Sequence, residues 1–177
     1  FTEYLSPPRE KGTKMLKLED QLWTYSPGTD RIIRISGHML RQSVMGSDMS
    51  YEDMMEDPEL HHLYDAEIVG EENIDGRDCW ILELKAKKQD VAYHSRKVWV
   101  DKERDLIMKE NRYGRSGKLL KSTQIYDVVR QDDRWVPIKI VVKDELKHGQ
   151  GTEFIVQEIR FDVDIPAHMF SKASLRR

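Results

Sequence analysis

Sulfur-containing side chains are concentrated in one short part of the sequence. Five of the eight methionines fall between residues 39 and 55, together with three other apolar or aromatic side chains. The group consists of Met39, Leu40, Val44, Met45, Met49, Tyr51, Met54 and Met55. Methionine is unbranched and polarizable, so it adapts to irregular apolar shapes and is common on promiscuous binding surfaces. Two interpretations are equally open: the segment is an adaptable lid over an apolar groove, or it fills the open end of a sheet as ordinary core.

Two further sets of apolar side chains have the spacing of a shared strand face. Trp23 and Tyr25 lie two residues apart, as do the successive members of the set Trp80, Leu82 and Leu84. Alternate residues of a strand point to the same side of a sheet. Each set could therefore line the floor of a groove that binds apolar ligands. For Trp23 and Tyr25, an ordinary structural role in a strand is the simpler alternative.

Residues that could support catalysis or metal binding do not form a recognisable pattern. The histidines are His38, His61, His62, His94, His148 and His168, and none has the H-E-x-x-H spacing of a zinc enzyme. The adjacent pair His61 and His62 is expected on opposite faces of a strand, as a solvated pair and not as a metal site. Cys79 is the single cysteine, and its apolar neighbours indicate a small buried side chain. The sequence also lacks a G-x-S-x-G elbow, so we expect no catalytic residues, no metal and no cofactor.

The overall composition excludes two classes of partner or location. The 177 residues carry a net charge of −3, and the lysines and arginines are scattered, so no electrostatic footprint for nucleic acid is present. Apolar runs such as 140–142 are far shorter than the ~20 residues of a membrane-spanning helix. We therefore expect a protein that is not integral to a membrane and that forms one domain over 1–177.

Turn-forming clusters alternate with strand-like runs from about residue 64 to the end. The clusters lie at 72–76, 101–105, 114–117, 130–134 and 147–151, and the runs between them are rich in Val, Ile, Tyr, Trp and Thr. Short connections between such runs predict antiparallel hairpins in sequence order. With three more segments at 13–18, 21–26 and 32–36, about ten strands are predicted. A sheet of that size normally curls, splits or closes to cover its apolar face.

One segment in the first half of the chain is helical in pattern. Ser50 and Asp53 have the spacing of a capping box, and three of the apolar side chains named above follow at helical intervals before Pro58. A shorter helix is predicted near residues 40–44. At the C-terminal end, Met169, Phe170 and Leu175 are expected to dock on the sheet.

These segments resemble the outer-membrane lipoprotein-sorting protein family, within the LolA/LolB-like superfamily of periplasmic lipoprotein carriers. The resemblance rests on Leu-Trp-Thr-Tyr-Ser-Pro at 22–27, Arg-Ile-Ile-Arg-Ile at 31–35 and Met-Gly-Ser-Asp-Met-Ser-Tyr-Glu-Asp-Met at 45–54. The Gly-Lys-Leu-Leu-Lys stretch at 117–121 and the C-terminal residues 170–175 are also similar to the family. The likeness extends over nearly the whole chain.

The resemblance implies a mainly β fold: a large curved antiparallel sheet that forms an unclosed (half) β-barrel with a short helical lid. It implies that the concave apolar face receives the acyl chains of a lipoprotein or another lipid. It also implies a cleaved signal peptide, a periplasmic location, and as partners an inner-membrane transporter and an outer-membrane acceptor. No catalytic residue and no cofactor is implied.

One departure from the family concerns the start of the chain. Relatives usually carry an N-terminal helix and strand before the region where this sequence begins, so part of the lid is expected to be missing. Two alternative functions remain. The first is a non-catalytic periplasmic module that docks on a lipid-exporting transporter or another envelope protein. The second, the least favoured, is an esterase or another hydrolase, which would need a nucleophile beside a base.

Overall fold

The computed structural model describes residues 1–56 and 59–176. The chain divides into two compact units, and each is considered by itself. The four-stranded unit comprises Phe1–Ser43, Ser50–Glu56 and Asp162–Arg177, and the seven-stranded unit comprises Val44–Met49 and Asp57–Phe161. Within the described residues the protein is mainly β, and neither of its two antiparallel sheets closes on itself. Pro58, which was expected to limit the first helix, lies outside the described residues.

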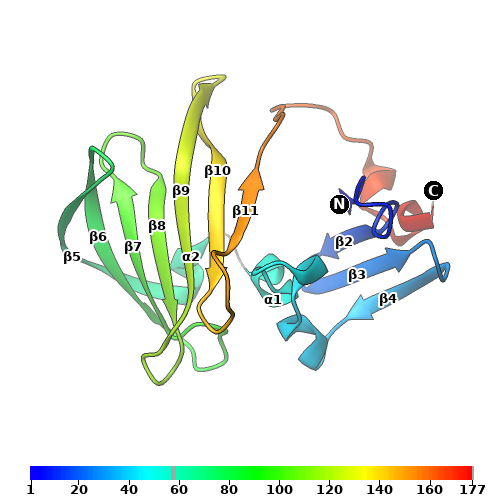
Figure 1. Cartoon of the computed structure of the whole chain (residues 1–177), viewed down its shortest axis with the longest axis horizontal. Helices are drawn as coiled ribbons and strands as arrows, with labels where there is room; N and C mark the ends of the chain where they lie inside the picture. Colours follow the sequence, from blue (N-terminus) through cyan, green and yellow to red (C-terminus); the bar gives the residue numbers. More distant parts are fainter. Residues whose placement is uncertain (57–58, 177) are drawn as a thin grey trace. The chain divides into compact units, whose positions relative to one another are not determined.

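The smaller sheet has the order β1-β2-β3-β4 (Figure 1). Its strands are β1 (Thr2–Glu3), β2 (Lys14–Leu18), β3 (Gln21–Ser26) and β4 (Arg31–Ile35), which confirms the three strands predicted near the start of the chain. Both faces are covered, because the adjacent residues Met15 and Leu16 are each fully buried. Leu175 is also fully buried where the C-terminal segment packs on β2 and β3, whereas Phe170 is 46% exposed.

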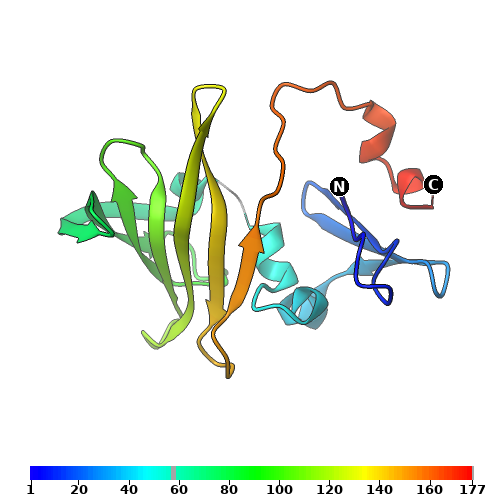
Figure 2. The ribbon, with the colours of Figure 1, turned by 45° about the horizontal axis from the view of Figure 1, so that its top comes forward.

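The larger sheet is a meander of seven strands in the order β11-β10-β9-β8-β7-β6-β5 (Figures 1 and 2). The strands are β5 (Tyr64–Ile74), β6 (Arg77–Ala86), β7 (Ser95–Asp101), β8 (Ile107–Tyr113), β9 (Leu119–Gln131), β10 (Arg134–Asp144) and β11 (Thr152–Ile155). The predicted turn clusters coincide with five of its connections. Each hairpin pairs neighbours in sequence, as expected for antiparallel strands joined by short loops.

Extra residues interrupt the register of this sheet at four strand pairs. Shifts occur between Ile68 and Gly70, between Trp99 and Val100, between Arg112 and Tyr113, and around Lys139. The last lies beside Pro137, a residue that a regular central strand tolerates poorly because it has no N–H to donate. Each such bulge bends its strand and increases the local twist, and the sheet is accordingly curved in Figure 2.

Short helices surround the sheets. They are α1 (Tyr51–Met55), α2 (Leu60–Leu63) and the 3-10 helices η1 (Gly37–Arg41), η2 (Val44–Gly46), η3 (Ala167–Phe170) and η4 (Lys172–Arg176). The predicted capping box is confirmed: the backbone N–H of Asp53 donates to Ser50 Oγ at 3.2 Å, and that of Ser50 donates to the Asp53 carboxylate at 2.7 Å. The prediction that His61 and His62 lie in a strand is wrong. Both belong to α2, and their ring centroids lie 4.1 Å apart.

The seven-stranded unit has two apolar clusters. One is built on Tyr64, Leu84 and Val98, with Leu60 and Leu63 of α2 packed against it. The other is built on Cys79, Trp99, Met108 and Ile125. Cys79 is fully buried, as its neighbours predicted.

Candidate functional site

The face of the seven-stranded sheet that packs against α2 carries an apolar cluster. Its buried centre is the Tyr64, Leu84 and Val98 cluster, and partly buried apolar side chains of three strands extend it. These are Leu82, Ala86, Val100 and Ile107. The register explains the grouping, since Leu82 pairs with Val98 and cross-strand partners share a face. We call this surface the apolar face.

A hollow of about 170 Å³ lies in the apolar face and is lined mainly by carbon. The lining residues are Ile107, Met108, Lys109, Glu110, Thr123, Ile125 and Ile140. Glu110 pairs with Thr123, and Ile125 pairs with Ile140, so these four side chains come from β8, β9 and β10 on one side of the sheet. The hydroxyl of Thr123 is buried and has no hydrogen-bond partner among the described residues. The hollow therefore combines apolar walls with one polar atom that a ligand could satisfy.

A buried ionic cluster lies at the edge of this hollow. Arg96 Nη1 donates to Glu110 Oε1 at 2.6 Å, and Arg112 Nε donates to Glu110 Oε2 at 2.9 Å. Arg96 Nη2 also donates to the hydroxyl of Tyr64 at 3.1 Å, and that hydroxyl donates to the carbonyl of Tyr93 at 2.8 Å. The Arg96 side chain is 1% exposed and that of Glu110 is 8% exposed. Charges as deeply buried as these need partners, and here each carboxylate oxygen has one.

The electrostatics of the cluster favour an ionised carboxylate. Burial by itself raises the pKa of Glu110, but the guanidinium groups of Arg112 and Arg96 outweigh it and hold the pKa below its usual range. Burial, with a smaller contribution from Glu110, raises the pKa of Tyr64 to about 12. The Tyr64 hydroxyl therefore stays protonated at neutral pH and can keep donating to Tyr93. The cluster therefore places paired charges beside an apolar surface.

This cluster was not predicted from the sequence. Arg96 and Arg112 were treated as part of a scattered, solvated set of basic residues. A signal does exist on β7, where Arg96 alternates with Val98 and so shares its buried face. On β8, the sequence Ile-Met-Lys-Glu-Asn-Arg-Tyr has no apolar alternation, because one of its two buried residues, Glu110, is charged.

Trp80, Leu82 and Leu84, the three β6 residues that were expected to line a groove, lie in different environments. Leu82 and Leu84 belong to the apolar face. Trp80 is 37% exposed, and the Lys102 ammonium lies 3.8 Å from the centre of one of its rings. All three residues lie on the same face as the hollow, since Trp80 pairs with Val100, but the Trp80 indole is stacked by a lysine.

Trp23 and Tyr25 lie on β3 in the four-stranded unit. They pair with Arg34 and Ile32 of β4 and share a face, as predicted. The ring of Trp23 is covered by the Lys172 ammonium, 3.5 Å from its centroid. Its indole N–H is buried and has no hydrogen-bond partner in the part of the chain that the structure describes.

The methionine-rich segment is divided between the two units. Met39 and Leu40 lie in η1, and Tyr51, Met54 and Met55 lie in α1. The two helices pack against each other. Val44, Met45 and Met49 belong to the seven-stranded unit, and Val44 is buried there.

Asp48 anchors the second part of this segment. The Asp144 backbone N–H donates to Asp48 Oδ1 at 2.9 Å, and the Thr152 hydroxyl donates to Oδ2 at 2.7 Å. Burial raises the pKa of Asp48, but these hydrogen bonds and the nearby Lys147 and Lys143 ammonium groups reverse the effect and lower it.

One group of metal-type ligands occurs among the described residues. Glu59, His61 and His62 each place a ligand atom within 4.8 Å of the others. All three side chains are exposed, at 52–73% for the rings and the carboxylate. The two imidazoles contact the same carboxylate, at 3.6 and 3.4 Å, which is an ordinary arrangement for solvated side chains.

Nothing in the described part of the chain has the length and apolar character of a membrane-spanning helix. Comparison with solved structures found neighbours over nearly the full chain. A DUF1329 family protein from Desulfovibrio piger is 29% identical, with a TM-score of 0.85, and the match covers 98% of this chain and 75% of that one. A domain named for outer membrane lipoprotein sorting, from Vibrio parahaemolyticus, is 25% identical, with a TM-score of 0.85 and coverage of 99% and 76%.

A third neighbour shows the fold alone. It is a LolA superfamily protein from Nitrosomonas europaea, which is 24% identical, with a TM-score of 0.70 and coverage of 97% and 76%. No curated protein matched the sequence. A family model described as "Uncharacterized protein" matches residues 1–177. The chain therefore belongs to that family, and its fold is LolA-like.

Proposed function

We propose that the chain is a periplasmic carrier that binds the acyl chains of a lipoprotein or another lipid on the apolar face, for transport toward the outer membrane. The observation that carries the proposal is the hollow beside Ile125 and Ile140, because it is lined by carbon yet not filled by the protein's own side chains. The neighbours with a LolA-like fold support it, and the isolated, ionised cluster around Glu110 gives no support to catalysis.

The hollow also indicates which part of a lipid would enter it. An acyl chain gains about 0.8 kcal/mol for each CH₂ that it buries, so apolar walls favour the hydrocarbon. The buried hydroxyl of Thr123 is a donor for the carbonyl of an ester or an amide, the group that joins an acyl chain to its carrier molecule. We propose that the carbonyl lies at Thr123 and that the chain extends over Ile125 and Ile140.

Fluorescent fatty-acyl esters titrated into the purified protein test this proposal. Ile140→Asp places a charge in the wall of the hollow, and we expect it to weaken binding by about tenfold or more, because a desolvated carboxylate is costly. The matched control is Ile155→Asp, since Ile155 is 62% exposed on β11. Equal binding by the two variants would exclude the apolar face as the acyl site.

The methionine-rich segment is part of the same proposal as an adaptable cover. Met45→Asp and Met54→Asp, which lie in different units, are each expected to reduce binding of the same probe while the β-rich circular dichroism spectrum is kept. A loss confined to Met45→Asp would restrict the cover to the seven-stranded unit. Unchanged binding in both would remove the segment from the site.

A further inference from the structure

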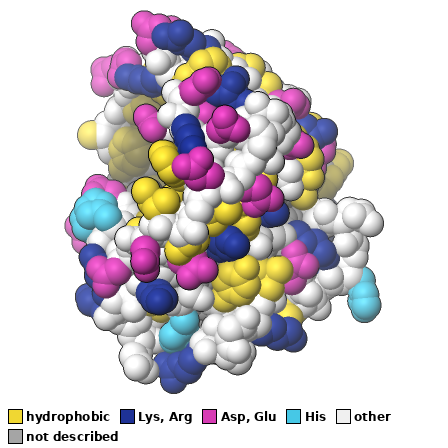
Figure 3. Space-filling view, turned by 90° about the vertical axis from the view of Figure 1, so that its left-hand side faces the viewer, with side chains coloured by type: hydrophobic (Ala, Val, Ile, Leu, Met, Phe, Trp, Pro, Cys, Tyr) yellow, Lys and Arg dark blue, Asp and Glu magenta, His cyan; other side chains and the backbone are white. Residues whose placement is uncertain are grey.

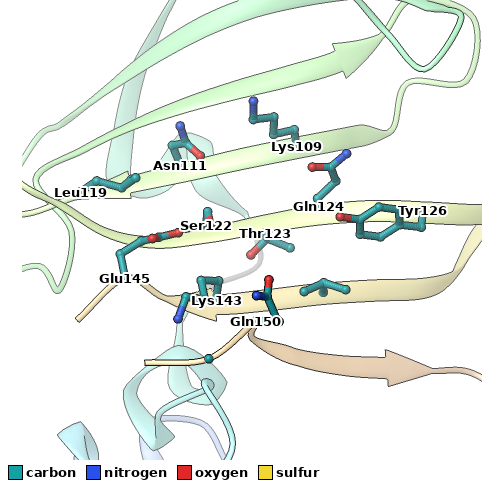
Figure 4. A pocket seen from close by; sticks show the side chains of 12 residues that line it. Lys109, Asn111, Leu119, Ser122, Thr123, Gln124, Tyr126, Lys143, Glu145 and Gln150 are labelled. Carbon is teal, nitrogen blue, oxygen red and sulfur yellow. Dashed lines mark hydrogen bonds between the residues drawn. The ribbon is translucent and has the colours of Figure 1, made fainter. Parts of the chain in front are cut away.

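The opposite face of the seven-stranded sheet has a second hollow, of about 420 Å³ and of different chemistry (Figure 4). Its floor comes from alternate residues of β8, β9 and β10. Lys109 and Gln124 pair across β8 and β9, and their neighbours Glu110 and Thr123 pair on the apolar face, so the two hollows lie on opposite sides of the same strands. Lys109 and Thr123 contribute to the lining of both hollows. The volume falls within the ~300–1,000 Å³ of small-molecule sites.

Two cross-strand rows of side chains cover this floor, and all of them except Val141 can form hydrogen bonds. Asn111, Ser122 and Lys143 form one row, and Lys109, Gln124 and Val141 form the next. Neighbouring strands are about 4.8 Å apart, so the donors and acceptors form a regular polar grid. Figure 4 shows the side chains of Lys109, Asn111 and Gln124 projecting from adjacent strands over the same hollow.

The β10–β11 loop closes one side of the hollow and depends on a glycine. Gly151 has φ +97°, and a Cβ there would lie 2.7 Å from the carbonyl oxygen of Val142. Only glycine lets the loop return this closely along β10. The return places Gln150 at the rim.

The charges in the hollow favour an anionic ligand. Neither Lys109 nor Lys143 has a carboxylate within ion-pair distance among the described residues, although Asp48 is near enough for Lys143 to lower its pKa. The Lys109 ammonium lies 4.5 Å from a ring centroid of Trp99, and that of Lys143 donates to the Lys147 carbonyl at 2.6 Å. The single acidic side chain of the lining, Glu145, accepts a hydrogen bond from Ser122.

The loops at the end of the sheet that includes the β10–β11 connection carry further positive charge. The connections 87–94, 114–118 and 145–151 carry five lysines or arginines against two acidic residues. The connections at the other end, 75–76, 102–106 and 132–133, carry the reverse ratio. Such an asymmetry directs an anion toward the end where Gln150 and Glu145 lie.

An aromatic ring beside the polar grid narrows the ligand class. Tyr126 is 53% exposed and lines the same hollow as the amides of Gln124 and Gln150. The negative face of an aromatic ring attracts the polarised C–H groups of a sugar, while amides, hydroxyls and ammonium groups bind its hydroxyls and acidic substituents. We propose that this hollow binds an anionic saccharide, a sugar that carries a phosphate or a carboxylate, on the face of the sheet opposite the acyl site.

Isothermal titration with three matched probes tests the proposal: trehalose 6-phosphate, trehalose and inorganic phosphate. We expect the phosphorylated sugar to bind at least about tenfold more tightly than either partial probe, since only it engages the ring and the cations together. Lys109→Gln, Lys143→Gln and Tyr126→Ala are each expected to weaken its binding about fivefold or more. Phosphate binding as tightly as the phosphorylated sugar would overturn the saccharide assignment.

Lys97→Gln is the matched control. Lys97 stacks on the same Trp99 indole as Lys109, at 5.3 Å, but lies outside this hollow. We expect Lys97→Gln to change binding of the phosphorylated sugar by less than about twofold. A loss as large as that of Lys109→Gln would mean that any nearby positive charge has the same effect, and it would reject the site. If Tyr126→Ala does not fold, Gln150→Ala on the loop replaces it, with the same expected weakening.

A second arm distinguishes a free saccharide from one attached to a lipid. Vesicles that carry a phosphorylated disaccharide glycolipid are compared with phosphatidylglycerol vesicles in a flotation assay. If the protein floats only with the glycolipid vesicles, and the Lys143→Gln variant does not, the ligand is a lipid-linked sugar. If the protein binds the soluble probe but does not float with the vesicles, the ligand is a free sugar. Equal flotation with both vesicles and no binding of the soluble probe would overturn the proposal.

Discussion

The Glu110 carboxylate shows how a charged residue can belong to an otherwise apolar face. Its two oxygens are bound by Arg96 and Arg112, and the whole group is shielded from water. Removing one partner of such a pair leaves an uncompensated buried charge, which costs more than the pair itself contributes. The cluster therefore fixes the relative positions of β7 and β8 next to the hollow.

Glu110→Gln is expected to lower the free energy of unfolding at pH 7 by about 3–5 kcal/mol. The folded-state pKa of Glu110 is below its unfolded value, so its ionised form stabilises the fold above the unfolded pKa, and this contribution is lost as the pH falls toward the folded pKa. Urea unfolding at pH 7 and in mildly acidic buffer down to about pH 3 checks this. The difference between wild type and variant should shrink at the acidic end.

Glu103→Gln provides the comparison for that measurement. Glu103 also pairs with an arginine, Arg77, at 2.7 Å, but its side chain is 79% exposed. Exposed ion pairs contribute at most about 1 kcal/mol. A Glu103→Gln variant that is destabilised as much as Glu110→Gln would show that burial of the pair is not what matters.

At the scale of the elements, the β10–β11 loop depends on one residue without a side chain. Gly151→Ala would bring a methyl group against the Val142 carbonyl oxygen, in addition to the strain of its positive φ. We expect this variant to lose about 1–3 kcal/mol of stability, measured as a lower midpoint of thermal unfolding.

Gly149 provides a control in the same loop. It also has a positive φ, +110°, but a Cβ there would meet open space. Gly149→Ala should therefore show only the cost of backbone strain. Equal midpoints for the two variants would mean that the close approach at Gly151 is not what restricts the residue.

The strands were largely predictable because period-two alternation is a direct consequence of half-buried sheets. The segment 21–26 and the turn clusters after residue 72 lie where the sequence placed them. The helix that starts after Ser50 was predictable for a similar local reason, the capping box. By contrast, α2 has four residues, too few for a helical period to appear, and His61 and His62 were therefore assigned to a strand.

The candidate site was less predictable, because it depends on register. Leu82 and Leu84 lie on the expected face, but the hollow itself is formed by Met108, Ile125 and Ile140, whose neighbours across the strands are set by bulges. The extra residues that cause the shifts have no compositional signature. Expected ligand contacts of Trp23, Tyr25 and the methionines remain predictions.

At the scale of the whole molecule, each of the two units has a core of its own. The four-stranded unit is built on Met15, Leu16, Leu22, Ile35 and Leu175, all buried. The seven-stranded unit has the two clusters described above and longer strands, up to the 13 residues of β9. Units with separate cores are expected to differ in their free energies of local unfolding.

Hydrogen–deuterium exchange followed by mass spectrometry can measure this difference. We expect the slowest exchange in peptides from β7, β8 and β9, at the centre of the larger sheet, and faster exchange in β3 and β4, because fewer strands protect them. Addition of an acyl ligand should slow exchange in β8 to β10. Identical protection in both units would indicate one cooperative structure.

The bulges of the larger sheet have a further consequence. Its strands differ locally in the number of residues, with one extra residue near each of Val69, Trp99 and Tyr113, and one on each strand of the β9–β10 pair near Pro137. Substitutions that keep chain length alter what lines the concavity, whereas single-residue deletions at these points alter its radius. The width of the concavity is thus set by strand length, separately from the chemistry of its wall.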